Sequence, residues 1–333
     1  MQVSYLLQAW GRVAKALKQD FIPYLGLVMP PLMQSALLKV DTDIVEEDAE
    51  PDEADEGIAT VVVQTDTGTK RVALKTSLLE EKSTACNMLV CYFAELGEGM
   101  FSYIEPVAHE MVKLLGYVYS EEVRTAAAAL MPELIKAAVS SRDKGMCDNT
   151  FVMQLANLVF EKLIGMVKEE PEPEVQLAMI EGLQEGIANG GPMCLGSEAR
   201  VNEVLDALRV VMGEVMERCQ TRAQKRQSDE DYDEDEEEVQ AEAAERDDDL
   251  VSNPLPNFFL SLNPLHSQLL SLSKSSSFST PACYMLPGSF FFKILYIYSW
   301  IGGRCAVGYA ELKASYTSSS RPHTLVAQGL IHS

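Results

Sequence analysis

Apolar residues recur at i, i+3, i+4 and i+7 through nearly every stretch between residues 4 and 227. Glycine, proline or a capping residue bounds each stretch, and alternating strand patterns are nearly absent. The pattern therefore predicts an all-α segment. The predicted helices cover residues 4–18, 20–39, 77–97, 100–118, 121–141, 147–168, 173–189 and 197–227. Short connections between these helices favour four helical hairpins.

Two local patterns refine this picture. Ser77 and Glu80 have the spacing of a capping box, in which each side chain satisfies a free backbone amide of the first turn, and they predict a helix start near residue 77. Residues 58–66 (IATVVVQTD) are rich in β-branched residues and could form a short strand. Because the alternation is short, we interpret them as an extended loop.

Similar segments recur along the helical region. Residues 81–86, 122–127 and 174–179 each begin with glutamate and continue into small or apolar residues, at offsets of 41 and 52. These offsets bracket the repeat length of about 40–47 residues that is typical of HEAT and armadillo proteins. The sequence thus predicts an all-α, HEAT/armadillo-type α-solenoid of about four helical hairpins.

Six aromatic residues fall at helical spacing on apolar faces. We interpret them as core, with a minority exposed as part of a groove. They are Trp10, Tyr24, Phe93, Phe101, Tyr103 and Phe160. Cys86 and Cys91 are likewise interpreted as small core residues.

The net charge of −23 is concentrated in two acidic runs, which we interpret as insertions into a neutral body. Residues 41–56 carry ten acids and no base, and residues 228–249 carry fourteen acids and one arginine. We therefore expect a helical domain at 1–227 that contains an acidic loop at 41–57, followed by an acidic disordered loop at 228–250.

The acid excess bears on possible ligands. It disfavours nucleic acid, whose phosphates would be repelled, and favours basic proteins as partners. Asp229, Asp231 and Asp233 resemble the start of a calcium loop, but Glu234 replaces the required glycine and Gln240 the bidentate glutamate. We expect no metal and no cofactor.

Catalysis and disulfides find no support in the sequence. P-loop, GxSxG and HExxH motifs are absent, and His109 is the only histidine of the helical region. The seven cysteines form no CxxC pair, which favours a reducing compartment over a disulfide framework. Arg218 and Arg222 precede the end of the last predicted helix, where cations oppose the helix dipole. We expect a protein that is not an enzyme.

Residues 251–333 differ from the rest of the chain. They are rich in serine and have no helical period. The apolar run at 290–301 is interrupted by Lys293 and is shorter than the roughly 20 residues of a transmembrane helix, so we expect no membrane contact. Likewise, the first twenty residues lack the features of a secretory signal. We interpret the tail as disordered or as the product of an altered reading frame, and such a product could lack independent activity.

Several strings resemble the beta-karyopherins, and most closely their importin-five (karyopherin beta-three) branch. In their order along the chain, and with the acidic runs between and after them, these strings are more specific than a generic HEAT pattern. The resemblance covers residues 4–250. The strings are LQAWGR (7–12), YLGLVMPPLM (24–33), LEEKSTACNMLVCY (79–92), VRTAAAALM (123–131) and KRQSDEDY (225–232).

The resemblance implies a nuclear import receptor found in the cytoplasm, the nucleus and the nuclear pore. In that family the second helices line a concave face that carries basic cargo and the GTPase Ran, and grooves between the outer first helices bind Phe-Gly nucleoporins. The resemblance assigns Ran to amino-terminal repeats that this sequence lacks. It thus identifies an internal fragment of such a receptor.

The acidic run after the last predicted helix is the candidate cargo-binding segment, acting by long-range attraction on Lys/Arg-rich proteins. Its residues are Asp229, Glu230, Asp231, Asp233, Glu234, Asp235, Glu236, Glu237 and Glu238. A solvated loop without function is the alternative for this run. For the whole chain the alternative is a generic HEAT scaffold for protein assembly, without transport activity.

Overall fold

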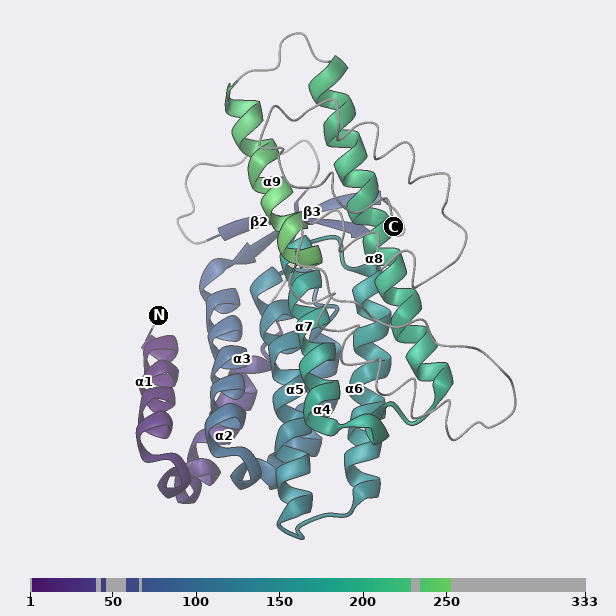
Figure 1. Cartoon of the computed structure of the whole chain (residues 1–333). Coiled ribbons are helices and arrows are strands. Elements are labelled where there is room, and N and C mark those ends of the chain that lie inside the picture. The colour runs from purple at the N-terminus through teal and green to yellow at the C-terminus, as the bar shows by residue number, and fades with distance from the viewer. Residues whose placement is uncertain (1, 40–42, 46–57, 66–67, 229–233, 253–333) are drawn as a thin grey trace, which may run out of the picture. The chain divides into compact units, whose positions relative to one another are not determined.

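The computed structural model describes residues 2–39, 43–45, 58–65, 68–228 and 234–252, which belong to the first of two compact units, Met1–Phe278 (Figure 1). Its α-helices are α1 (Gln2–Leu17), α2 (Leu25–Ala36), α3 (Thr76–Leu96), α4 (Phe101–Leu114), α5 (Glu121–Asp143), α6 (Asn149–Glu169), α7 (Pro173–Gly190), α8 (Glu198–Ser228) and α9 (Glu234–Ser252). Short 3₁₀ helices occupy Lys18–Tyr24, Gly97–Met100 and Pro192–Leu195. The predicted tail at 253–333 lies outside the described residues.

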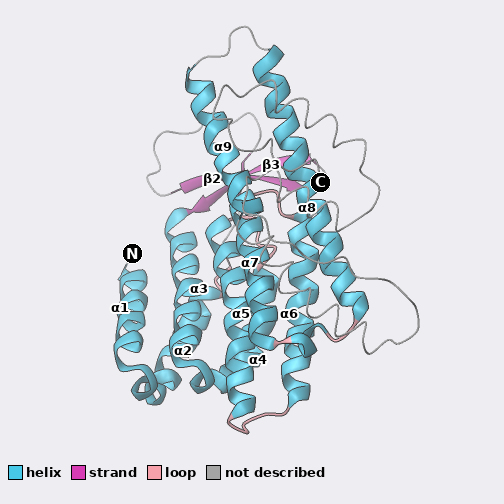
Figure 2. Ribbon diagram, viewed as in Figure 1, coloured by secondary structure: helices cyan, strands magenta, loops and turns pink. Residues whose placement is uncertain are grey.

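The helices form two layers of antiparallel hairpins (Figure 2). In one layer α1 packs on α3, α3 on α5, α5 on α7 and α7 on α9. In the other layer α4 packs on α6 and α6 on α8. All eight predicted helices are present, and the hairpins α1–α2, α3–α4, α5–α6 and α7–α8 confirm the prediction of a HEAT-type fold.

Close contact between α5 and α7 depends on glycine. A Cβ atom on Gly182 would lie 2.9 Å from the carbonyl oxygen of Ala128, and one on Gly186 would lie 2.9 Å from the ring of Phe160. Because neither backbone nor a packed ring can move cheaply, only glycine fits at these two positions. The small residues of α5 and α7 therefore set the distance between neighbouring repeats.

The six predicted aromatic residues differ in their burial. Phe93 and Phe160 are buried, and so is Phe21, which the sequence pattern did not single out. Trp10, Phe101 and Tyr103 are half-buried. Tyr24 is 48% exposed, so it belongs to the exposed minority that the interpretation allowed. Cys86 is buried and Cys91 is half-buried.

The helix starts agree with the pattern, although one predicted cap is wrong. Helix α3 begins at Thr76, and its N-cap residue, Lys75, makes no capping hydrogen bond through its side chain. Ser77 therefore lies within the first turn rather than at the cap. Side chains do cap other helices, because the amide of Val123 donates to Ser120 Oγ and the amide of Phe151 donates to Asp148 Oδ1.

Part of the segment between α2 and α3 is a small antiparallel sheet rather than a loop. Strands β1 (Asp43–Val45), β2 (Ile58–Thr65) and β3 (Gly68–Lys75) pair in the order β1-β3-β2. The interpretation of residues 58–66 as a loop was wrong, because β3 supplies a pairing partner that the short alternation of β2 could not reveal. Residues 46–57 of the first acidic run lie outside the described residues.

Helix α6 is long and apolar enough to cross a membrane by length and composition. It packs against α4, α5, α7 and α8, and its apolar face is buried among them. A core helix of a helical-repeat protein has these same properties, so the apolar character of α6 is explained by its position in the stack.

Candidate functional site

The predicted cargo-binding acids belong in part to a helix. Residues 229–233 lie outside the described residues, whereas Glu234, Asp235, Glu236, Glu237 and Glu238 fall in the first turns of α9. The expectation of a disordered loop at 228–250 was therefore wrong for residues 234–250. Two causes favour the helix: acids near a helix N-terminus oppose the positive end of its dipole, and Leu250 near the other end is fully buried.

Helix α9 is held on α8 by a buried ion cluster. Asp247 is 2% exposed, and its Oδ1 accepts hydrogen bonds from Arg218 Nε (2.9 Å) and Nη2 (2.7 Å). Arg222 Nη2 lies 2.6 Å from Asp247 Oδ2. The two groups form an ion pair, but their geometry is not that of a hydrogen bond. The two arginines thus hold α9 on α8. Their interpretation as cations that oppose the dipole at a helix end did not predict this role.

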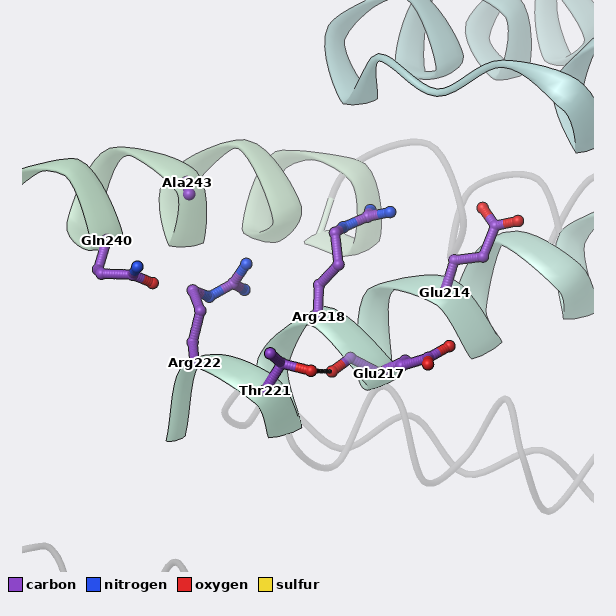
Figure 3. A pocket seen from close by; sticks show the side chains of 7 residues that line it. All are labelled: Glu214, Glu217, Arg218, Thr221, Arg222, Gln240 and Ala243. Carbon is purple, nitrogen blue, oxygen red and sulfur yellow. Dashed lines mark hydrogen bonds between the residues drawn. The ribbon is translucent and has the colours of Figure 1, made fainter. Parts of the chain in front are cut away.

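Figure 3 shows an open pocket between α8 and α9. Its volume is about 480 Å³, and its lining combines the two arginines with carboxylates on the same helix. The lining residues are Glu214, Glu217, Arg218, Thr221, Arg222, Gln240 and Ala243. Because Asp247 already engages both arginines, the pocket has no surplus positive charge with which to attract an anion.

Further contacts join α7 to α8 and α9. Gln176 Nε2 donates to the carbonyl oxygen of Val167 at 3.0 Å and to Glu214 at 3.3 Å. Arg246 of α9 lies 3.5 Å from Glu174 of α7. Helix α9 is therefore fixed to both α7 and α8.

Both acidic runs join the helical stack at the same edge. The connections α2–α3 and α8–α9 each lead from a second helix to the next first helix, and antiparallel helices place all such connections at one end of the hairpins (Figure 1). Glu121 and Glu172 lie at the intervening connections. Burial raises the pKa of Glu121, and the Glu172 carboxylate raises it further. Glu121 and Glu172, which lie at successive connections, thus place two negative charges near each other along this edge.

A polar surface covers the second helices. Gln154, Asn157 and Glu161 follow one exposed stripe of α6, and Glu105 of α4 is also exposed. Helix α6 packs between α4 and α8 within its own layer and against α5 and α7 of the first-helix layer. The exposed stripe therefore faces away from the first-helix layer. These residues were not among those predicted from the sequence, because their helical spacing is also that of an ordinary solvated face.

The described residues hold no group of three or more potential metal ligands of the His, Cys, Asp or Glu type. His109 is exposed on α4. Burial raises the pKa of the Cys86 thiol to about 12, which suppresses the thiolate form that a nucleophile requires.

Comparisons with known proteins show that the chain is similar to importins. Residues 175–254, from α7 to the end of α9, match the family model "Importin repeat 6". Importin subunit beta-3 of Saccharomyces cerevisiae is 31% identical over 221 residues, which cover 66% of this chain and 20% of that protein. A probable importin-5 homolog of Dictyostelium discoideum is 29% identical over 196 residues, or 57% of this chain and 17% of that protein.

Solved structures agree with the sequence relatives. Kap121p bound to Nup53p matches with a TM-score of 0.65 and 26% identity, over 80% of this chain and 24% of Kap121p. Kap121p bound to RanGTP matches with a TM-score of 0.60 and 25% identity, over 81% of this chain and 24% of Kap121p. The chain spans about a fifth of the length of the relatives it matches.

Proposed function

We propose that this chain, which belongs to the importin-beta family of nuclear transport receptors, forms part of a receptor surface that binds basic cargo proteins for import into the nucleus, without catalysing a reaction. One observation carries the proposal. In a HEAT-type stack similar to importins, the helix ends that flank the two acidic runs lie at a single edge, and the second run continues into a helix that is fixed in place.

The electrostatics support a basic partner. Opposite charges attract over roughly 8–10 Å at physiological ionic strength, so a fixed acidic helix raises the local concentration of Lys/Arg-rich segments before they make contact. The exposed amides and carboxylates of α4 and α6 offer hydrogen-bond acceptors on the second-helix layer. Together they suit an extended basic chain better than a folded acidic protein.

Further partners and the location follow from the same proposal. A transport receptor crosses the nuclear pore, so we propose that the protein occurs in the cytoplasm, in the nucleus and at the pore, and that it contacts Phe-Gly nucleoporins. Among its structural neighbours, Kap121p has been solved with Nup53p and with RanGTP. Ran binding to this chain is also a proposal, and a pull-down with Ran loaded with GTP or GDP tests it.

The experiment uses the full chain and a fluorescent protein that carries a Lys-rich extension, with affinity measured at several salt concentrations. We expect the affinity to fall steeply with salt. Replacing the five acids at 234–238 with Gln or Asn should weaken binding at least about tenfold and flatten the salt dependence. Circular dichroism of this variant checks that α9 is retained.

The matched control neutralises acids elsewhere. Glu181 and Glu185 are exposed on α7, away from the edge where the acidic runs join, so E181Q/E185Q should bind the basic protein like the parent chain. Salt-independent binding that survives neutralisation of residues 234–238 would contradict the proposal. Tight binding to one folded partner, without binding to Phe-Gly peptides, would instead favour a scaffold for protein assembly.

A further inference from the structure

Strand β2 is a long edge strand of the small sheet. Strand order β1-β3-β2 leaves β2 with a neighbour on one side among the described strands. Its register with β3 runs without interruption from Ile58 opposite Lys75 to Thr65 opposite Gly68. A continuous register without a bulge keeps the backbone straight enough to accept another strand on its free side.

The register shows which backbone groups face that free side. Two residues separate Thr65 from Gly68, and the residues that flank a two-residue hairpin loop exchange both hydrogen bonds. Backbone groups of successive residues in a strand point to alternate sides. Starting with Thr65, every second residue of β2 therefore directs its N–H and C=O groups toward β3. The remaining residues direct theirs outward: Ile58, Thr60, Val62 and Gln64.

The sequence of β2 lacks the usual protection of an edge strand. Natural edge strands avoid pairing with other chains by being short or by carrying lysine, proline or a bulge. Residues 58–65 (IATVVVQT) contain no proline and no charged residue, and most of them favour the β conformation. The opposite edge differs, because β1 spans only Asp43–Val45. The free side of β2 is therefore the suitable edge for strand addition.

We infer that the free edge of β2 binds an extended, Lys/Arg-rich segment of a partner protein by β-strand addition. This inference rests on the proposed function, since it names how one part of a basic cargo would bind. Charge favours a basic occupant over other extended peptides: residues 46–56 contain eight acids and no base, and the chain reaches Ile58 two residues later. Backbone hydrogen bonds supply the contact, and the adjacent charge selects the partner.

Synthetic ten-residue peptides test this mode with the full chain. A peptide of alternating lysine and threonine should bind, as measured by fluorescence anisotropy, and an alternating glutamate–threonine peptide should bind at least about tenfold more weakly. A lysine–threonine peptide methylated at every backbone nitrogen from its second residue keeps its charge but cannot donate backbone hydrogen bonds. We expect its affinity to fall at least about tenfold.

A matched pair of variants tests the edge itself. Val62→Pro removes an outward N–H and places a ring on the free side, while the ladder to β3 uses other residues. Val62→Ala shortens the same side chain and keeps the N–H. We expect V62P to weaken lysine–threonine binding about tenfold and V62A to leave it unchanged. Hydrogen exchange at Val61 and Val63 checks that the ladder persists in both.

The possible failures can be told apart. Equal binding of the methylated peptide, equal binding by V62P and the parent, or no binding of the lysine–threonine peptide would each overturn strand addition. Each of these results leaves the proposed function intact, because that function is tested with a basic protein and the acids at 234–238. Conversely, salt-independent cargo binding that survives neutralisation of residues 234–238, together with V62P-sensitive peptide binding, would remove the transport proposal and retain the edge site.

Discussion

Arg124 and Glu170 form a two-point ion pair that joins the start of α5 to the end of α6. Arg124 Nε donates to Glu170 Oε2 at 2.8 Å, and its Nη2 donates to Oε1 at 2.9 Å. Both residues are less than one-tenth exposed. Arg124 Nη1 also donates to the carbonyl oxygen of Tyr117, so one guanidinium joins the α4–α5 connection to the end of α6. The pair thus holds the start of α5 against the end of α6.

We predict that Arg124→Leu destabilises the chain by about 3–5 kcal/mol, because it leaves the Glu170 carboxylate buried without its partner. The double variant R124L/E170L should recover part of this loss, since it removes the unpaired charge. Urea unfolding followed by circular dichroism provides the measurement. If both variants unfold at the urea concentration of the parent, the pair is not a structural lock.

Glycine substitutions test the close contact of α5 and α7. Gly182→Ala places a Cβ atom 2.9 Å from the carbonyl oxygen of Ala128, so we expect a loss of about 1–3 kcal/mol in the free energy of unfolding. Gly165 on α6 is the control, because a Cβ there would meet nothing within 4 Å. Gly165→Ala should leave stability unchanged or raise it by up to about 1 kcal/mol through helix propensity. Equal effects of the two substitutions would show that contact with α5 is unimportant.

The helices were predictable from sequence because their signal is local. A 3.6-residue period within one segment is enough to place α5 or α6, whichever segments it packs against. The features that were missed depend on distant partners. Strand β2 required β3, and the docking of α9 required Asp247 to reach Arg218 and Arg222, 29 and 25 residues earlier in the chain.

The same distinction between local signals and contacts with distant residues applies to the candidate site. Charge counting found the acidic runs, but it could not show that residues 234–238 start a helix, because that helix depends on tertiary contacts at Asp247 and Leu250. The common edge of the two runs could be reasoned from the alternation of hairpins, once the helices were known. The polar stripe on α6 is present in the sequence pattern but is not distinguishable there from an ordinary solvated face.

The buried thiol of Cys86 predicts a pH dependence above pH 9. Burial raises the pKa of this thiol from 9.0 to about 12, and nearby Lys82 partly opposes the shift. A raised pKa means that the folded state retains a proton that the unfolded state releases. The free energy of unfolding should therefore fall by about 1.4 kcal/mol per pH unit as the pH rises above 9, until the native thiol itself ionises.

Comparison of Cys86→Ala with the parent isolates this contribution. Urea midpoints measured at pH 8, 9, 10 and 10.5 should decline less steeply in C86A, and the same should hold for Cys86→Ser because neither variant carries the thiol. Both variants retain any decline that is due to tyrosines, including Tyr117, whose burial raises its pKa to about 12. Identical pH slopes in the parent and both variants would contradict this account.

Asp247 determines whether α9 stays docked, and two neighbouring aspartates allow a matched test. Asp247→Asn keeps the shape of the side chain but removes the charge that both Arg218 and Arg222 contact, whereas Asp249→Asn neutralises an exposed residue on the same helix. We expect hydrogen exchange across residues 239–250 to accelerate at least about tenfold in D247N, corresponding to a loss of roughly 1–3 kcal/mol once the partial exposure of Arg218 is taken into account. D249N should exchange like the parent. Equal protection of α9 in both variants would show that apolar contacts such as those of Leu250 hold the helix without the ion cluster.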